Sequence, residues 1–286
     1  MRALIFTLAL LAATPAPAQT VTATIPLLAG IIGDITRGVS ATESLLPANS
    51  EAHQFSLNPS QIKSISEAPV IFAVGNNMEP WLLRVEPHLA PGAVVKLGEL
   101  DSVAALTLNA RSFSGAASGD FDPHQWMDPD IIDIWAQEIA ARLLAVSPES
   151  AADIEANLAS LRADITGINT QLQTLAAQFE NREISIVVSH DAYQYLERNL
   201  GLDQAGMLSD INDNAAGARS LSELSRLEGN ICFVIDPNET LPKGILSQAT
   251  RASIDPLGIA YLGQENYTRS FFGGVIAALE TCLQSE

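Results

Sequence analysis

The feature that most constrains the fold is a regular hydrophobic stripe in the middle of the chain. Its members follow one another at steps of three or four positions: Ile154, Leu158, Leu161, Ile165, Ile168, Leu172, Leu175 and Phe179. This spacing places them on one narrow face of an α-helix. Ser147, Pro148 and Glu149 are residue types typical of a helix start. The pattern predicts one helix over residues 148–179, roughly 48 Å long at about 1.5 Å per residue.

Such a stripe is typical either of a coiled-coil dimer or of a helix that connects two parts of one chain. Its surroundings favour the connecting helix, because short β-branched runs followed by helical patterns occur on both sides. These predicted strands cover residues 21–27, 70–74, 93–97, 184–188, 232–235 and 259–262. Strands that alternate with helices form mainly parallel sheets. We therefore predict an α/β fold with an N-terminal lobe (19–147) and a C-terminal lobe (180–286), joined by the long helix (148–179), and a monomer.

The composition is that of a globular protein with an acidic surface. Of the 286 residues, 47% are hydrophobic and 17% charged, and the formal net charge is −18. Nucleic-acid binding needs clustered Lys and Arg, and anionic membranes repel such a chain. The charge therefore argues against nucleic acid and anionic lipid as partners.

The first 18 residues resemble a secretory signal peptide. Arg2 precedes a hydrophobic run over residues 3–13, and a small Ala-Pro-Ala segment ends at Ala18. The run is too short to cross a membrane. We expect an exported protein in the periplasm. In an oxidising compartment, Cys232 and Cys282 can form a disulfide, although two free buried thiols remain an alternative.

The four histidines are the candidate metal ligands, and three of them lie at the ends of predicted elements. His190 follows the strand predicted at 184–188, where ligands of parallel sheets bind. His124 lies in DPHQWMDP, which we interpret as a rigid, solvent-facing loop with Asp122 placed to orient the imidazole. His53 precedes a helix that begins near Asn58. His88 lies between prolines and is interpreted as structural or merely exposed.

Asp255, in IDPLG, begins a tight turn ahead of the last predicted strand. Together with His53, His124 and His190 it would form a ligand set that suits tetrahedral Zn²⁺. These residues are too far apart in sequence for a zinc finger. Both lobes must therefore contribute to the site.

Five motifs resemble, in order, the zinc-binding periplasmic solute-binding proteins of ABC importers (the ZnuA-like group). They are HQFSLNPSQ, VIFAVGNNMEPWL, DPHQWMDP, SHDAYQYLERNLGL and IDPLG. The resemblance implies a metal site between two lobes, with His53, His124, His190 and Asp255 as ligands. It also implies the Cys232 to Cys282 disulfide and delivery of zinc to an inner-membrane permease, with a periplasmic zinc chaperone as a further partner. No histidine-rich loop precedes His124, unlike many members.

Two alternatives remain open at this point. Manganese-binding relatives typically have a carboxylate at the third ligand position, so His190 favours zinc, but manganese or a broader range of divalent metals is the first alternative. The second is a secreted zinc hydrolase with three protein ligands, in which Asp255 acts as general base. The chain lacks an HExxH motif, which argues against the hydrolase. Glu51 or a water molecule could complete the coordination.

Overall fold

The computed structural model of the chain describes residues 20–48, 50, 52–53, 55–113, 117–180, 182–237 and 244–284. The predicted signal peptide (1–18) and Glu51 lie outside the described residues. No helix within these ranges has both the length and the hydrophobicity needed to cross a membrane.

The N-terminal lobe contains a parallel sheet with the strand order β2-β1-β3-β4. Its strands are β1 (Val21–Ala23), β2 (Thr42–Ser44), β3 (Ile71–Ala73) and β4 (Val94–Lys96). Its helices are α1 (Pro26–Thr36), α2 (Pro59–Glu67), α3 (Leu82–Val85) and α4 (Pro129–Val146). The strand predicted at 21–27 is too long, because Pro26 begins α1, where its missing N–H costs nothing. Residues 42–44 were not predicted as a strand, but they form β2.

The C-terminal lobe contains a second parallel sheet, with the strand order β10-β9-β7-β8. Its strands are β7 (Ile184–His190), β8 (Gln204–Ser209), β9 (Asn230–Ile235) and β10 (Thr250–Ser253). Its helices are α6 (Gln194–Leu200), α7 (Ala218–Leu224) and α8 (Tyr267–Leu283).

The last predicted strand, at 259–262, is wrong. The chain forms a 3-10 turn there (Ile259–Tyr261), preceded by Gly258 at φ 61°. The last strand is β10, so Asp255 follows that strand instead of preceding it. The other 3-10 turns are Glu86–His88, Leu97–Glu99, Asp101–Val103, Gln125–Met127 and Pro148–Ser150.

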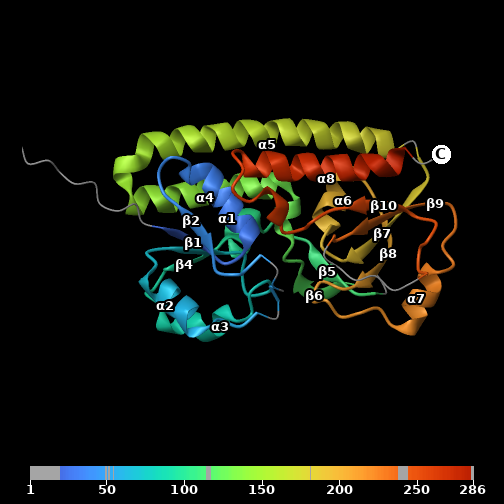
Figure 1. Cartoon of the computed structure of the whole chain (residues 1–286), viewed down its shortest axis with the longest axis horizontal. Coiled ribbons are helices and arrows are strands. Elements are labelled where there is room, and N and C mark those ends of the chain that lie inside the picture. Colours follow the sequence, from blue (N-terminus) through green and yellow to red (C-terminus); the bar gives the residue numbers. More distant parts are fainter. Residues whose placement is uncertain are drawn as a thin grey trace, which may run out of the picture.

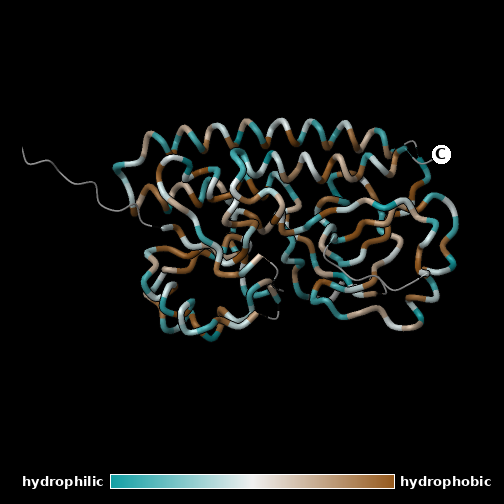
Figure 2. The backbone as a smooth tube through the Cα atoms, in the orientation of Figure 1, coloured by the Kyte–Doolittle hydropathy of each residue, from teal (hydrophilic) through white to brown (hydrophobic). Residues whose placement is uncertain are grey.

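The hydrophobic stripe lies on α5 (Ala151–Glu180), which follows the 3-10 turn Pro148–Ser150. Figure 1 shows α5 running along both lobes, with α4 and α8 packed below it. Hydrophobic and hydrophilic stretches alternate along this helix (Figure 2). Seven of the eight stripe residues are buried within the chain, and Leu158 is partly buried against the same core. The stripe therefore leaves no hydrophobic face for a coiled-coil partner.

A disulfide between Cys232 of β9 and Cys282 of α8 fastens the last helix to the C-terminal sheet. The two Cα atoms are 5.4 Å apart. Both cysteines of the chain are in this bond, so the free-thiol alternative is wrong.

An antiparallel hairpin of β5 (Asn109–Arg111) and β6 (Ala117–Phe121) precedes His124 and contacts the C-terminal lobe (Figure 1). The Tyr195 hydroxyl of α6 donates to the backbone oxygen of Asp122 (2.8 Å) and accepts from the backbone nitrogen of Leu108 (3.1 Å). The segment that leads into His124 is thus attached to the lobe that carries His190.

Candidate metal centre

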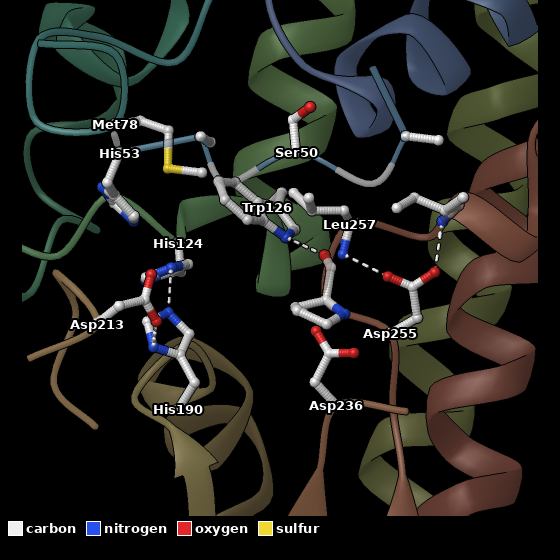
Figure 3. Close-up of a pocket in the computed structure, with 14 residues that line it drawn as sticks. Ser50, His53, Met78, His124, Trp126, His190, Asp213, Asp236, Asp255 and Leu257 are labelled. Atoms are coloured by element: carbon white, nitrogen blue, oxygen red, sulfur yellow. Dashed lines mark hydrogen bonds and ion pairs between the residues drawn. The ribbon is translucent and has the colours of Figure 1, made fainter. Parts of the chain in front are cut away.

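Three of the four histidines meet in one cluster at the interlobe cleft (Figure 3). His53 lies in the loop before α2, His124 directly precedes the 3-10 turn Gln125–Met127, and His190 is the last residue of β7. One nitrogen of each ring lies within 4.8 Å of the other two. His88 is exposed and outside the cluster. Among the described residues, this is the one group of histidine, cysteine, aspartate or glutamate that meets the spacing of a metal site.

The spacing within the cluster suits a tetrahedral metal. The Nε2 atoms of His124 and His190 are 3.3 Å apart. Zinc binds imidazole nitrogen at about 2.0–2.1 Å, and a tetrahedral angle between two such bonds separates the nitrogens by about 3.3–3.4 Å. The ring of His53 is 5.8 Å from that of His124 and 6.5 Å from that of His190, between centroids. A cation placed between the Nε2 pair would thus have the third imidazole beside it.

Asp122 orients the ring of His124, as predicted from the motif. One carboxylate oxygen, Oδ1, lies 2.8 Å from Nδ1 of His124 and accepts the backbone N–H of the same residue at 2.9 Å. Because an ionised carboxylate only accepts, Nδ1 carries the proton and Nε2 keeps its lone pair. His124 is 3% exposed and packs edge-on against Trp126. The prediction of a solvent-facing loop was therefore wrong for this residue, because neighbouring side chains such as Trp126 shield its ring from solvent.

Asp213 lies beside Nδ1 of His190, as Asp122 lies beside Nδ1 of His124. Its Oδ1 atom lies 2.9 Å from Nδ1 of His190, and the Ser209 hydroxyl lies 3.3 Å from the same nitrogen. The Nε2 atoms of the two histidines lie 3.3 Å apart, so each is an acceptor toward the other where Nδ1 carries the proton. Two such acceptors repel unless a proton or a metal cation lies between them. Asp213 was not among the predicted site residues, although the segment LSDINDN at the end of β8 contains a cluster of acids and amides.

Burial keeps His53 uncharged at neutral pH. The pKa of His53 is lowered from 6.5 to about 4 by burial first, and then by His124 and His190, whereas Asp213 opposes the shift. Metal binding requires the neutral imidazole. His53 is therefore in the protonation state that a metal ligand needs.

The structure does not bring the Asp255 carboxylate to the histidines. Its oxygens accept the backbone N–H groups of Leu257 (3.0 Å) and Ile259 (2.6 Å). Asp255 lines the same cleft, of about 480 Å³, but lies on the other side of Trp126 (Figure 3). The indole N–H of Trp126 donates to the backbone oxygen of Pro256 at 2.9 Å. This bond couples the turn of Asp255 to the segment that carries His124.

A buried ion-pair network fixes the residue that follows His190. Asp191 is fully buried. Its Oδ1 atom accepts hydrogen bonds from two nitrogens of Arg111, Nη2 at 2.7 Å and Nε at 3.0 Å. The same Nη2 contacts Glu197 of α6 at 2.7 Å. Arg111 belongs to β5, in the segment that leads to His124. His124 and His190 are therefore held by one network, and His53 comes from a separate loop of the N-terminal lobe.

Comparison with known proteins places the chain in a family. Residues 21–268 match the family described as zinc-uptake complex component A, periplasmic (ZnuA). The chain belongs to this family. It is 28% identical to the high-affinity zinc uptake system protein ZnuA of Haemophilus ducreyi over 98% of both chains. It is 25% identical to the protein of the same name from Paracoccus denitrificans, over 96% of this chain and 95% of that one.

The fold is shared with a solved ZnuA structure. The TM-score is 0.73 at 20% identity, over 93% of this chain and 98% of that one. The family relationship and the two-lobed fold implied by the five sequence motifs are thus confirmed. The family is that of a transport component, so the chain is not an enzyme, and the hydrolase alternative is abandoned.

Proposed function

We propose that this protein captures Zn²⁺ in the periplasm and delivers it to the permease of an ABC importer in the inner membrane. The observation that carries the proposal is the 3.3 Å separation between the Nε2 atoms of His124 and His190. Each ring has its Nδ1 beside a carboxylate, so both lone pairs point to one place. Membership of the zinc-uptake family supports zinc as the cargo.

His53, His124 and His190 are the proposed protein ligands, with Asp255 in the fourth position. Because Asp255 accepts backbone N–H groups of its own turn, it would have to exchange these bonds for the metal. Such an exchange fits a movement of the lobes about the cleft. While Asp255 keeps these backbone bonds, a water molecule would take the fourth position of the proposed site.

We further propose that the protein is a monomer and that its first 18 residues are a signal peptide that is removed on export. Its proposed divisions are the N-terminal lobe (19–147), the connecting helix (148–179) and the C-terminal lobe (180–286). A periplasmic zinc chaperone is a further proposed partner. Without a histidine-rich loop before His124, the three-histidine cluster would perform the capture itself.

Zinc binding to protein freed of metal by a chelator tests this proposal. A titration against a competing chelator should show one tight site, and manganese at the same free concentration should not displace zinc, because imidazole prefers the softer ion. Equal binding of manganese would support the broader metal range instead. The absence of tight zinc binding would contradict the proposal.

A further inference from the structure

His190 has a carboxylate beside its Nδ1 atom, and this carboxylate, of Asp213, belongs to the loop after β8. We propose that Asp213 fixes the tautomer and the direction of the His190 ring, so that Nε2 is the atom that binds zinc. The inference rests on the proposed zinc-binding function and goes beyond it. It assigns a role to a residue outside the predicted ligand set.

Asp213 is in direct contact with the ring of His190. Asp213 Oδ1 lies 2.9 Å from Nδ1 of His190, and Ser209 Oγ lies 3.3 Å from it. Because the Ser209 hydroxyl donates to the backbone oxygen of Ser189 (3.2 Å), its oxygen is left to accept. Both neighbours of Nδ1 are therefore acceptors, and the proton resides on Nδ1. The lone pair of Nε2 then points at His124 (Figure 3).

The loop after β8 holds Asp213 in a defined backbone conformation. The residue has a φ of +60°, a left-handed conformation that non-glycine residues seldom adopt. Its backbone N–H donates to the backbone oxygen of Asp210 at 3.0 Å. The Asp210 carboxylate accepts the backbone N–H groups of Asn212 (2.9 Å) and Asn214 (3.0 Å). These bonds on either side hold the loop in the conformation that directs Asp213 toward the cleft.

The surroundings of the His190 ring resemble those of the His124 ring. Asp122 lies two residues before His124, and its Oδ1 atom is 2.8 Å from Nδ1 of that histidine. Asp213 reaches the same geometry from a different loop, 23 positions after His190 by the numbering. A carboxylate on the distal nitrogen of a metal-binding imidazole raises the basicity of the ring and fixes its direction. Both histidines of the close pair therefore have such a carboxylate.

Two variants of Asp213 separate positioning from charge. Asp213→Ala removes both the acceptor and the charge, whereas Asp213→Asn retains an amide oxygen that accepts from Nδ1. We expect zinc affinity to fall about 10–100-fold in Asp213→Ala and by a smaller factor in Asp213→Asn. The control is Asp203→Asn, which removes the same charge at the exposed position before β8 and should leave the affinity unchanged.

The tautomer of His190 can be measured by ¹⁵N NMR in the metal-free and zinc-bound protein. If Asp213 only stabilised the fold, its replacement would leave this tautomer unchanged. The Nδ1–H form should dominate in the wild type and in Asp213→Asn, and the Nε2–H form should gain population in metal-free Asp213→Ala. An unchanged tautomer and affinity in Asp213→Ala would overturn the inference, as would equal losses of affinity in both variants. If the wild type fails to bind zinc, the proposed function fails, while the metal-free tautomers still decide the role of Asp213.

Discussion

The Nε2 atoms of His124 and His190 lie 3.3 Å apart, although 66 positions separate the residues in sequence. Two features produce this proximity. Each Nδ1 is next to a carboxylate, and the network of Arg111, Asp191 and α6 holds the two segments together. His53 completes the cluster from a separate loop of the N-terminal lobe. The same network therefore holds two of the three imidazoles, and the third lies on a loop outside that network.

Disrupting the ion-pair network of Arg111, Asp191 and Glu197 should lower the stability of the fold. Arg111→Ala leaves the buried carboxylates of Asp191 and Glu197 without their cation, so the free energy of unfolding should fall by about 3–5 kcal/mol. Arg142→Ala is the matched control, because Arg142 pairs with Glu138 on the exposed face of α4 and should change stability by less than about 1 kcal/mol. Urea unfolding of the metal-free proteins measures both. Similar losses in the two variants would show that the buried network has no special importance.

His53 should make the metal-free protein less stable in acid. The pKa of His53 is about 4 in the folded protein, whereas the ordinary histidine value of 6.5 applies to the unfolded chain. Between these values the unfolded chain binds a proton that the folded chain does not, so the stabilising contribution is present above pH 6.5 and is lost as the pH falls toward 4. Thermal unfolding of His53→Gln should therefore depend less on pH than that of the wild type over this interval. Parallel pH profiles would show that burial does not suppress the protonation of this ring.

Replacing Asp255 tests the proposed fourth ligand. Asp255→Asn retains an oxygen for the backbone N–H of Leu257 but removes the negative charge that would neutralise zinc. If the carboxylate leaves its turn to bind the metal, zinc affinity should fall by at least about tenfold, which corresponds to about 1.4 kcal/mol. Competition with a chelator measures this change, and the melting temperature of the metal-free variant reports on the turn. Unchanged affinity would assign the fourth position to water.

The disulfide should stabilise the fold without affecting the metal. The two cysteines are 50 positions apart, and closing a loop of this size contributes up to about 4 kcal/mol in the chain-entropy description. Replacing Cys232 and Cys282 together with Ala should lower the melting temperature. Zinc affinity of the folded variant should stay at the wild-type value, since neither cysteine lines the cleft that contains the histidines. A loss of affinity at a temperature where the variant is folded would show that the disulfide also shapes the cleft.

Much of the fold is predictable from the sequence because its main signals are local. The stripe on α5 needs only the helical period, and Asn58 and Asp128 are local helix caps that the structure contains. The strand β10 was missed because TRAS has neither a continuous hydrophobic run nor strict alternation. The run at 259–262 was predicted as a strand for its composition, but Gly258 and the bonds to Asp255 turn the chain there.

The candidate site was only partly predictable, for a physical reason. His124 has its orienting carboxylate two residues away, so DPH contains both members of the pair. His190 has its carboxylate on a loop after the next strand, and only the fold brings Asp213 to it. The orientation of Asp255 likewise depends on which donors surround it, and its own turn supplies three backbone N–H groups.

The most direct test of the central claim is a crystal structure of the zinc-bound protein, with the metal located by anomalous scattering at the zinc edge. The account predicts a single strong peak at about 2.0–2.1 Å from Nε2 of His124 and of His190, with a ring nitrogen of His53 as third ligand. Nδ1 of His190 should remain beside Asp213. A zinc ion bound elsewhere, or one that leaves any of the three histidines uncoordinated, would contradict it.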